Sequence, residues 1–471
     1  MVPNSGTTTL KHGSVGFWRV VFQGVSASAP AGAIVTFITA ASVYAGGSLP
    51  LSFLIAFFAV LSVSVPIYQY SKKISHAGGY YAFVSRSAGP FAGIMTGMLV
   101  LGYHFLVLGF LPLFFSIILS FTFQYFFGIT LPVYFWAIVV VLYILITAIP
   151  PYLGIKPSLN YSFIFGWAEI IVIAIVAIII AILSGSHNSA AVFSTKYSPT
   201  GFHGALLGGI FGISAFLGFS SIVSLGEEAE FPKKVIGKAL ITDVLISGTF
   251  LVGTAYAFDI GWGPANAISM SNYLVPLTVE TNSFLGLFAA VIVTIFFIES
   301  YYNVGLSFFT STIRYFYGMA RDDHIIPVYF AKIHDESGVP RRALILIVII
   351  GLAFALIFGA VFGPLEGYIL EATGLTILAL TALIIVALTV GFLFKRENEF
   401  NIVWHLVIPV ISAGLMAFVI YATVYPPSYP LTYMAIGAVV WAAISAALTL
   451  YVRKYKPDKY KDAGKYSSVE D

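Results

Sequence analysis

The sequence predicts an all-α integral membrane protein with twelve transmembrane helices, and its composition and hydrophobic pattern support this prediction. The 471-residue chain is 59% hydrophobic and only 9% charged, with a mean hydropathy of +0.95. Soluble domains carry about a quarter of their residues as Asp, Glu, Lys or Arg, so these few charges cannot cover a water-facing surface. The apolar residues form runs of about 20 or more, the length a helix needs to cross a bilayer, without the alternation of barrel strands.

Hydrophobic runs between polar positions or Pro/Gly positions define the twelve spans. They are expected to start near Trp18, Leu51, Phe91, Val133, Asn160, Gly204, Ala239, Ser283, Ala343, Tyr368, Val403 and Leu431.

Basic residues predict the direction of these spans. Alternate connections lie at 46–50, 126–132, 185–202, 260–282, 363–367 and 425–430. Together they contain only Lys196 among the 23 Lys and Arg residues. Because basic residues concentrate on the cytosolic side of membrane proteins, we expect a multi-pass protein of the cell membrane with both termini in the cytosol.

Two predicted spans are interrupted near the middle of the membrane. The first contains Ser26–Ala33, a small-residue run that includes Pro30, and the sixth contains Gly212–Ser221. Backbone groups freed by a break inside a bilayer need partners, so breaks persist beside a cavity, an ion or a polar substrate. Paired breaks in two repeats indicate a transporter binding site. A proline kink and glycine packing are the alternative interpretation.

The spacing of these breaks predicts the domain organisation. Pro30 and Gly218 are 188 residues apart, as two five-helix repeats would place them. The predicted units are a cytosolic tail 1–14, a first repeat 15–185, a second repeat 203–396, two peripheral helices 402–453 and a cytosolic tail 454–471. The second tail is charged and polar, and is expected to be solvated and mobile.

Three acidic residues, Glu169, Glu299 and Glu371, lie well within apolar spans. A carboxylate there should face a cavity, a partner or a proton pathway. Glu169 and Glu299 are candidates for proton exchange, with a structural carboxyl group as the alternative, whereas Glu371 is expected at the outer rim. The eighth span carries a polar stripe, which comprises Glu299, Asn303, Ser307, Thr310, Ser311 and Arg314. A structural polar seam between helices is the alternative interpretation of this stripe.

Several function classes lack sequence support. The chain has no cysteine, which excludes disulfides and Cys-bound metals, and it shows no His/Asp/Glu cluster at metal spacing. It has no phosphate-binding loop for ATP hydrolysis, so transport energy would come from an ion gradient. Basic residues along one membrane face are explained by topology, so nucleic-acid binding is not expected.

Three further segments carry recognisable motifs. They are AGGYYAFVSRSAGP at 77–90, FLGF at 216–219 with LGEEAEFP at 225–232, and STIR, MARDD and IP within 311–327. In this order along nearly the whole chain, they resemble the signatures of the amino acid–polyamine–organocation (APC) permeases.

The resemblance implies the leucine-transporter fold, with two inverted five-helix repeats, two peripheral helices, and spans 1 and 6 unwound around an amino acid. It implies that amides of Ala31–Ala33 receive the substrate carboxylate, and that the segment 216–219 receives the amino group and side chain, with an aromatic gate. The predicted substrate site comprises Ser28, Ala29, Ala31, Gly32, Ala33, Tyr103, Phe216, Gly218, Phe219 and Ser220.

The predicted function is secondary active transport of an amino acid by alternating access. Neither an enzymatic activity nor a cofactor is expected, and the partners are a small-molecule substrate and the lipid bilayer. The coupling ion is H⁺ or Na⁺, with H⁺ preferred. The predicted coupling residues are Glu169, Glu299, Asn303, Ser307 and Ser311. Sodium-coupled uptake or exchange of a polyamine or organic amine is the alternative, and a channel or membrane-embedded enzyme is a more distant one.

Overall fold

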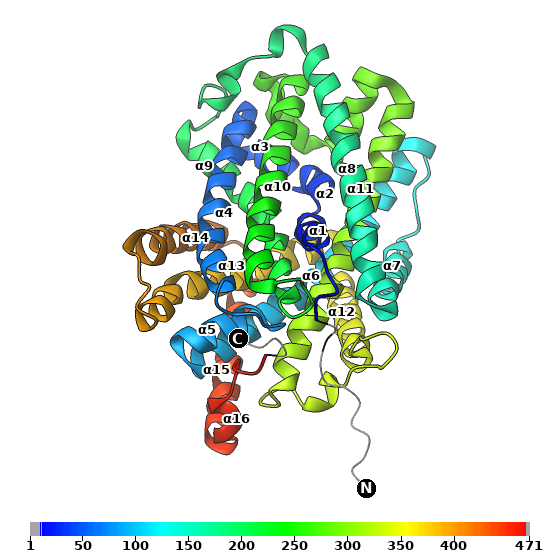
Figure 1. Cartoon of the computed structure of the whole chain (residues 1–471). Helices are drawn as coiled ribbons and strands as arrows, with labels where there is room; N and C mark the ends of the chain where they lie inside the picture. Colours follow the sequence, from blue (N-terminus) through cyan, green and yellow to red (C-terminus); the bar gives the residue numbers. More distant parts are fainter. Residues whose placement is uncertain (1–9, 11, 468–471) are drawn as a thin grey trace.

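The computed structural model describes residue 10 and residues 12–467, and its secondary structure is helical apart from one isolated bridge between Val15 and Ala229 (Figure 1). The helices of the first half are α1 Phe17–Ser28, α2 Pro30–Ala33, α3 Thr39–Ala45, α4 Leu49–Ser71, α5 Tyr80–Ala88, α6 Pro90–Phe127, α7 Phe135–Leu153 and α8 Ile155–Leu183. Those of the second half are α9 Phe202–Ala215, η5 Leu217–Leu225, α10 Pro232–Trp262, α11 Pro276–Arg321, α12 Arg341–Phe362, α13 Pro364–Arg396, α14 Ile408–Val424, α15 Thr432–Tyr455 and α16 Pro457–Lys461.

Helix length and composition confirm an all-α membrane protein. Within the described part of the chain, 11 helical stretches are long and apolar enough to cross a membrane. The first, Phe17–Ser71, has 55 residues, more than twice the roughly 20 that one crossing needs. It includes two predicted spans, which meet at a turn where Gly46 has a φ of +54°. The count of twelve crossings therefore stays a prediction.

The long helices alternate between two faces of the molecule. We call the face at the ends of α4, α11, α13 and α15 the terminal face. The opposite face carries the connections 46–48, 185–201, 263–275 and 425–431. In Figure 1 the connection 185–201 is at the top and α16 is near the bottom. The broken helices lie in the interior between these faces, where α1 packs against η5, α8, α10 and α11.

Both predicted breaks are present, and they touch each other. Helix α1 ends at Ser28, because Ala29 adopts a left-handed conformation with φ 44° and ψ 66° before Pro30 restarts the helix as α2. In the second repeat, α9 ends at Ala215 and the chain continues beyond Phe216 as a 3-10 helix. A side chain on Gly218 would collide with the Ala27 carbonyl, so glycine permits this close approach.

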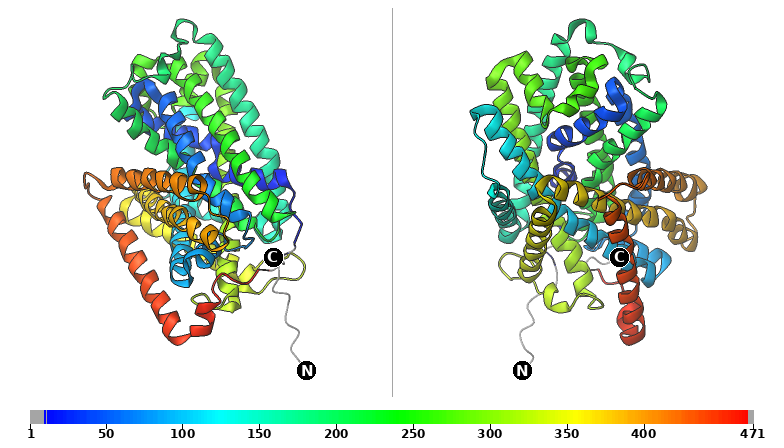
Figure 2. Two further views of the ribbon diagram at one scale, coloured as in Figure 1. Left: turned by 60° about the vertical axis from the view of Figure 1, so that its left-hand side comes forward. Right: turned by 180° about the vertical axis from the view of Figure 1, so that it is seen from behind.

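The C-terminal part of the described chain makes contacts with the protein, while the mobility of the tail stays a prediction and residues 468–471 lie outside the described residues. Helices α14 and α15 lie at the outside of the bundle, with α15 at its edge in Figure 2. Residues 456–467, which we call the C-terminal strap, return from α15 to the terminal face. Arg86 Nε donates to the Gly464 carbonyl at 3.0 Å, and Asp322 accepts from the Gly464 N–H at 2.7 Å. These backbone bonds join the strap to the rest of the protein.

Gly218→Ala is expected to destabilise the protein, because the added Cβ would lie 1.9 Å from the Ala27 carbonyl oxygen. Such overpacking costs about 1–3 kcal/mol and should lower the thermal unfolding midpoint in detergent by several degrees. Gly253→Ala in α10 is the matched control, since its Cβ meets nothing within 4 Å. Equal midpoints for the two variants would contradict the contact between the breaks.

Candidate functional site

A cavity of about 770 Å³ lies between the two helix breaks and the opposite face. Ala27–Ala29 and Gly32–Ala33 line it on one side, and Ser214, Ala215, Leu217 and Gly218 line it on the other. Tyr425 and Pro426, in the connection at the opposite face, line its mouth. The cavity therefore reaches from the breaks toward the face away from the termini.

The walls of the cavity are apolar and aromatic. The described residues that line it include no Asp, Glu, Lys, Arg or His side chain. The aromatic residues in the wall are Phe37, Tyr44, Tyr103, Phe110, Phe211, Tyr301, Phe308, Tyr368 and Tyr425. Polar groups are supplied by the backbone of the breaks and by the hydroxyl residues Ser28, Thr36, Ser214, Thr373, Thr376, Thr423 and Ser428. Such a cavity suits a small molecule whose charges are met by backbone dipoles.

Several backbone groups of the breaks have hydrogen-bond partners, both within the broken helix and on other helices. The Gly32 N–H donates to Ser300 Oγ at 3.1 Å, and the Ala33 N–H donates to the Ala29 carbonyl at 2.7 Å. The Ser28 hydroxyl donates to the Phe216 carbonyl at 3.5 Å, which joins the two breaks. These bonds satisfy part of the backbone that the breaks release inside the membrane.

The structure brings together part of the predicted substrate site. Ser28, Ala29, Gly32, Ala33, Tyr103 and Gly218 line the cavity. The Tyr103 hydroxyl donates to the Leu217 carbonyl at 3.0 Å, which fixes the ring beside the second break. The other four residues, Ala31, Phe216, Phe219 and Ser220, are buried outside the cavity lining. In this conformation the aromatic wall is therefore formed by residues other than Phe219.

Glu169 is buried beside the first break. Its carboxylate lies close to the Ser300 hydroxyl and the Ala31 backbone N–H, and Glu299 is a neighbouring acid. Both Glu169 oxygens are buried without a hydrogen bond to a described residue. Since Ser300 also accepts from the Gly32 N–H, one hydroxyl connects this carboxyl group to the backbone of the break.

The polar stripe on α11 faces neighbouring helices, not the cavity. Ser162 in α8 donates to Asn303 Oδ1 at 2.8 Å, and its hydroxyl also lies 3.4 Å from the Ser307 hydroxyl. Gln23 in α1 donates to the Ser307 carbonyl at 2.9 Å. The Ser311 hydroxyl returns to its own helix, donating to the Phe308 carbonyl at 3.2 Å. These contacts form a seam between α1, α8 and α11.

Two buried ion pairs close the terminal face. Arg321, at the end of α11, makes a double hydrogen bond to the Glu227 carboxylate, at 2.7 and 2.8 Å. About two turns earlier on α11, Arg314 pairs with the Glu228 carboxylate through two of its nitrogen atoms. All four side chains are nearly inaccessible to solvent. These pairs join the chain after η5 to α11, on the opposite side of the breaks from the cavity mouth.

Two histidines at the terminal face are held neutral. Burial, with a contribution from the neighbouring Arg321 charge, lowers the pKa of His76 to about 3. Burial and the Lys456 charge lower the pKa of His324 to about 4. Because both values are below the ordinary pKa of about 6.5, neither ring changes charge between about pH 5 and 8.

Comparisons with known proteins identify the family. A family model described as "Amino acid permease" matches residues 19–461. The chain belongs to the amino acid permease family. This confirms the resemblance to APC permeases, and it makes the protein a transporter and not an enzyme.

Curated relatives of this permease are named for different substrates. The chain is 26% identical over 356 residues to "Branched-chain amino acid permease BcaP" of Bacillus subtilis (strain 168), covering 72% of this chain and 73% of the relative. "Glutamate/serine transporter AimA" of the same organism is 24% identical, over 31% of this chain and 28% of the relative. "Cationic amino acid transporter 4" of Mus musculus is 28% identical, over 43% of this chain and 31% of the relative.

Sequence reasoning missed several buried acids of this permease. Asp243 lies within α10, where Oδ1 accepts from Ser247 at 3.0 Å and Oδ2 faces Gly24. With the predicted start near Ala239, Asp243 would lie at the end of the span, close to water. Because α10 begins at Pro232, seven residues earlier, Asp243 lies further inside the helix than the sequence suggested. Asp259 and Glu280 are also buried. Glu371 is fully buried against Gly109, which corrects its predicted place at the rim. Among the described residues, no cluster of three acids or histidines could hold a metal ion.

Arg321→Gln is expected to weaken closure of the terminal face, because it leaves Glu227 buried without its arginine partner. Loss of one partner of a buried pair costs about 3–5 kcal/mol. Since the chain has no cysteine, Ser214→Cys provides a single reporter on the cavity wall. Its modification by an impermeant thiol reagent added at the opposite face should slow by about tenfold in the Arg321→Gln background.

Lys332→Gln is the matched control for this labelling experiment. Lys332 is an exposed cation on the same face and makes no ion pair with a residue that the structure describes. The control should keep the labelling rate of Ser214→Cys. An unchanged rate in Arg321→Gln would show that the buried pair does not hold the terminal face closed.

Proposed function

We propose that the protein is a secondary active transporter that carries neutral, apolar amino acids across the cytoplasmic membrane by alternating access, coupled to protons. The observation that supports this most is a cavity between two broken helices whose described lining has no charged side chain. In this proposal the terminal face is cytosolic, as the distribution of basic residues predicts.

The substrate's two charges would be met by backbone groups. The start of α2 carries the partial positive charge of a helix N-terminus, which suits a carboxylate. The Gly32 and Ala33 N–H groups point to Ser300 and Ala29, so substrate binding would exchange these partners for the carboxylate. Carbonyls of the second break, at Phe216 and Leu217, would receive the ammonium group in exchange for the Ser28 and Tyr103 hydroxyls.

The substrate's side chain would occupy the apolar part of the cavity. Val107, Leu111 and Ile210 line it together with the aromatic residues. A charged side chain there would lose its hydration without a counter-ion, and this cost excludes cationic and anionic amino acids. One relative is named as a branched-chain amino acid permease, and side chains of that kind would suit this apolar part of the cavity.

Proton coupling would act through Glu169. An ionised Glu169 would accept hydrogen bonds from the Ser300 hydroxyl and the Ala31 N–H. A protonated Glu169 carries an O–H donor on one oxygen, so it would accept these hydrogen bonds less strongly. Because Ser300 also holds the Gly32 N–H, a change in Glu169 protonation would alter the backbone that receives the substrate. The proton and the amino acid would thereby be linked through one hydroxyl.

Sodium is the alternative coupling ion, because hydroxyl groups cluster near the first break. Ser26 donates to the Ser162 carbonyl at 3.2 Å, and the Ser162 hydroxyl lies near Ser307 and Asn303. Oxygen ligands of this kind suit a hard cation.

Uptake into proteoliposomes tests the function. Labelled leucine and valine should accumulate when an inward proton gradient is imposed, and lysine and glutamate should neither accumulate nor compete. A sodium gradient at equal pH is the parallel condition, and accumulation there alone would replace the proton with sodium. Absence of leucine and valine uptake and exchange under both gradients would overturn the proposal.

Glu169→Gln is expected to retain leucine exchange but to lose acceleration by the proton gradient, because a glutamine side chain does not bind and release protons at physiological pH. The expected loss is at least about tenfold in gradient-driven uptake, with little change in exchange. Glu371→Gln makes the same chemical change at another fully buried acid, which lies against Gly109 of α6, and should keep the gradient response. A pH response that persists in Glu169→Gln would contradict the coupling role, and it could not be attributed to His76 or His324.

A further inference from the structure

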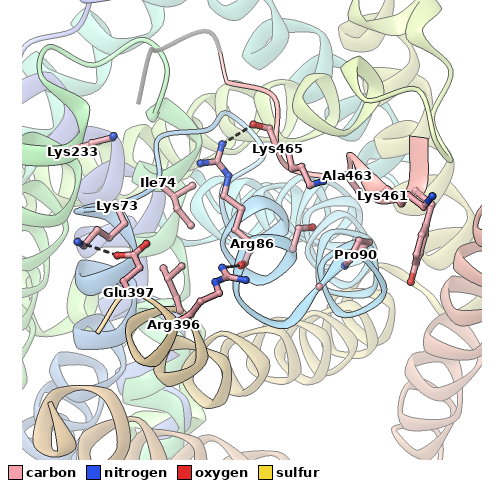
Figure 3. Close-up of a pocket in the computed structure, with 14 residues that line it drawn as sticks. Lys73, Ile74, Arg86, Pro90, Lys233, Arg396, Glu397, Lys461, Ala463 and Lys465 are labelled. Atoms are coloured by element: carbon pink, nitrogen blue, oxygen red, sulfur yellow. Dashed lines mark hydrogen bonds and ion pairs between the residues drawn. The ribbon is translucent and has the colours of Figure 1, made fainter. Parts of the chain in front are cut away.

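A second pocket, of about 860 Å³, lies at the terminal face and shares no lining residue with the substrate cavity. Figure 3 shows the side chains that line it. Its walls come from the ends of α5 and α13, the starts of α6 and α10, the loop after α4, and the C-terminal strap. These elements are ends of membrane-spanning helices or segments beside them. The pocket therefore lies at the level where lipid headgroups meet the protein.

Cationic side chains dominate this pocket. Six of its 14 lining residues are basic, against a single acidic residue, Glu397. The six are Lys73, Arg86, Lys233, Arg396, Lys461 and Lys465. Lys73 is paired with Glu397 at 3.0 Å and with Glu399 at 2.7 Å. Arg396 donates to the Arg86 carbonyl, a neutral group, and Lys461 makes no ion pair with a described residue. Lys465 is paired with Asp462 at 3.4 Å. Among the described residues, six basic side chains against Glu397, Glu399 and Asp462 leave a net positive charge.

The start of a long helix also favours an anionic ligand in this pocket. The 38-residue helix α6 begins at the pocket, with Gly89 and Pro90 in its wall, so its partial positive charge adds to the side chains. Ser85 also lines the pocket, and it is only 7% exposed. Its hydroxyl is itself buried against Gly93 and Gly464 and has no hydrogen-bond partner among the described residues.

The positive-inside rule alone does not explain this arrangement. It places basic residues on one side of the membrane but does not direct them from five separate chain segments into one pocket. Exposed cations on the same face, such as Lys156 and Lys332, lie outside it. Convergence of cations with a helix start is the chemistry of a phosphate site.

We propose that this pocket binds a phosphate ester, the headgroup of an anionic phospholipid of the inner leaflet. The strap forms part of the wall through Lys461 and Lys465, and α5 forms another part through Arg86, which also donates to the Gly464 and Lys465 carbonyls. A bound headgroup bridges the strap and α5. Because the strap also contacts Arg321 through the Tyr466 carbonyl at 3.0 Å, the lipid supports closure of the terminal face.

The test uses the purified full-length protein in a neutral detergent. Short-chain phosphatidylglycerol, short-chain phosphatidylcholine and soluble glycerol phosphate are titrated separately, and the thermal unfolding midpoint is recorded. Phosphatidylglycerol should raise the midpoint in a saturable manner, and the other two ligands should not at the same concentrations. In the double variant Lys461→Gln/Arg396→Gln, the half-saturating concentration should rise about tenfold.

Matched variants separate binding from folding. Lys156→Gln/Lys332→Gln removes two exposed cations of the same face outside the pocket and should titrate like the unmodified protein. Lys461→Arg/Arg396→Lys keeps the charge and should retain most of the response, even if the neutral variant is poorly folded.

Three results would overturn the proposal. Equal effects of phosphatidylglycerol and phosphatidylcholine would show that no anionic headgroup is recognised. Equal effects of glycerol phosphate and phosphatidylglycerol would assign the site to a soluble phosphate ester in place of a lipid. An unchanged half-saturating concentration in Lys461→Gln/Arg396→Gln, with the response of the charge-keeping variant also unchanged, would place phosphatidylglycerol elsewhere on the protein.

Discussion

The need to satisfy backbone groups inside a bilayer is the constraint on which the rest of this structure depends. A helix that stops at Ala29 releases N–H and carbonyl groups that lipid cannot solvate. Ser300, Ser28 and the second break at Phe216 supply partners for some of them. The broken backbone therefore fixes which helices must meet in the interior, and it leaves dipoles available to a polar substrate beside an apolar cavity.

The two faces of the molecule differ in their chemistry. On the terminal face, buried arginine–carboxylate pairs and the C-terminal strap join η5, α5 and α11. On the opposite face, apolar and aromatic side chains line a cavity mouth. Charged pairs that separate into water are solvated again, so they can open without leaving buried charges unpaired. This asymmetry suits a transporter that alternates between two closed faces.

The fold was largely predictable, because a membrane imposes length and polarity on each helix. Span positions followed from apolar runs, and both breaks followed from small residues and Pro30. The strap was not predictable, since its main bonds involve backbone groups of Gly464 and Lys465, which leave no side-chain pattern. Its polar sequence was read as a mobile tail.

The site was predictable in position but only partly in detail. Ser28, Gly32 and Gly218 line the cavity, whereas Phe219 does not. Near a break, the change from α-helix to 3-10 helix rotates each following side chain by an amount that sequence periodicity does not give. Asp243 was not predicted as a buried acid for a related reason. Helix α10 begins about two turns nearer the terminal face than its hydropathy suggested, and this places Asp243 further inside the helix.

Substrate protection of a cysteine at the break is the measurement that tests the central claim most directly. Ser28→Cys, in this cysteine-free chain, places one thiol on the cavity wall at the end of α1. The account predicts modification by an impermeant reagent added at the opposite face, slowed by leucine or valine in a saturable manner and unaffected by lysine or glutamate. A thiol that reacts at the same rate with and without every amino acid would contradict a substrate site between the breaks.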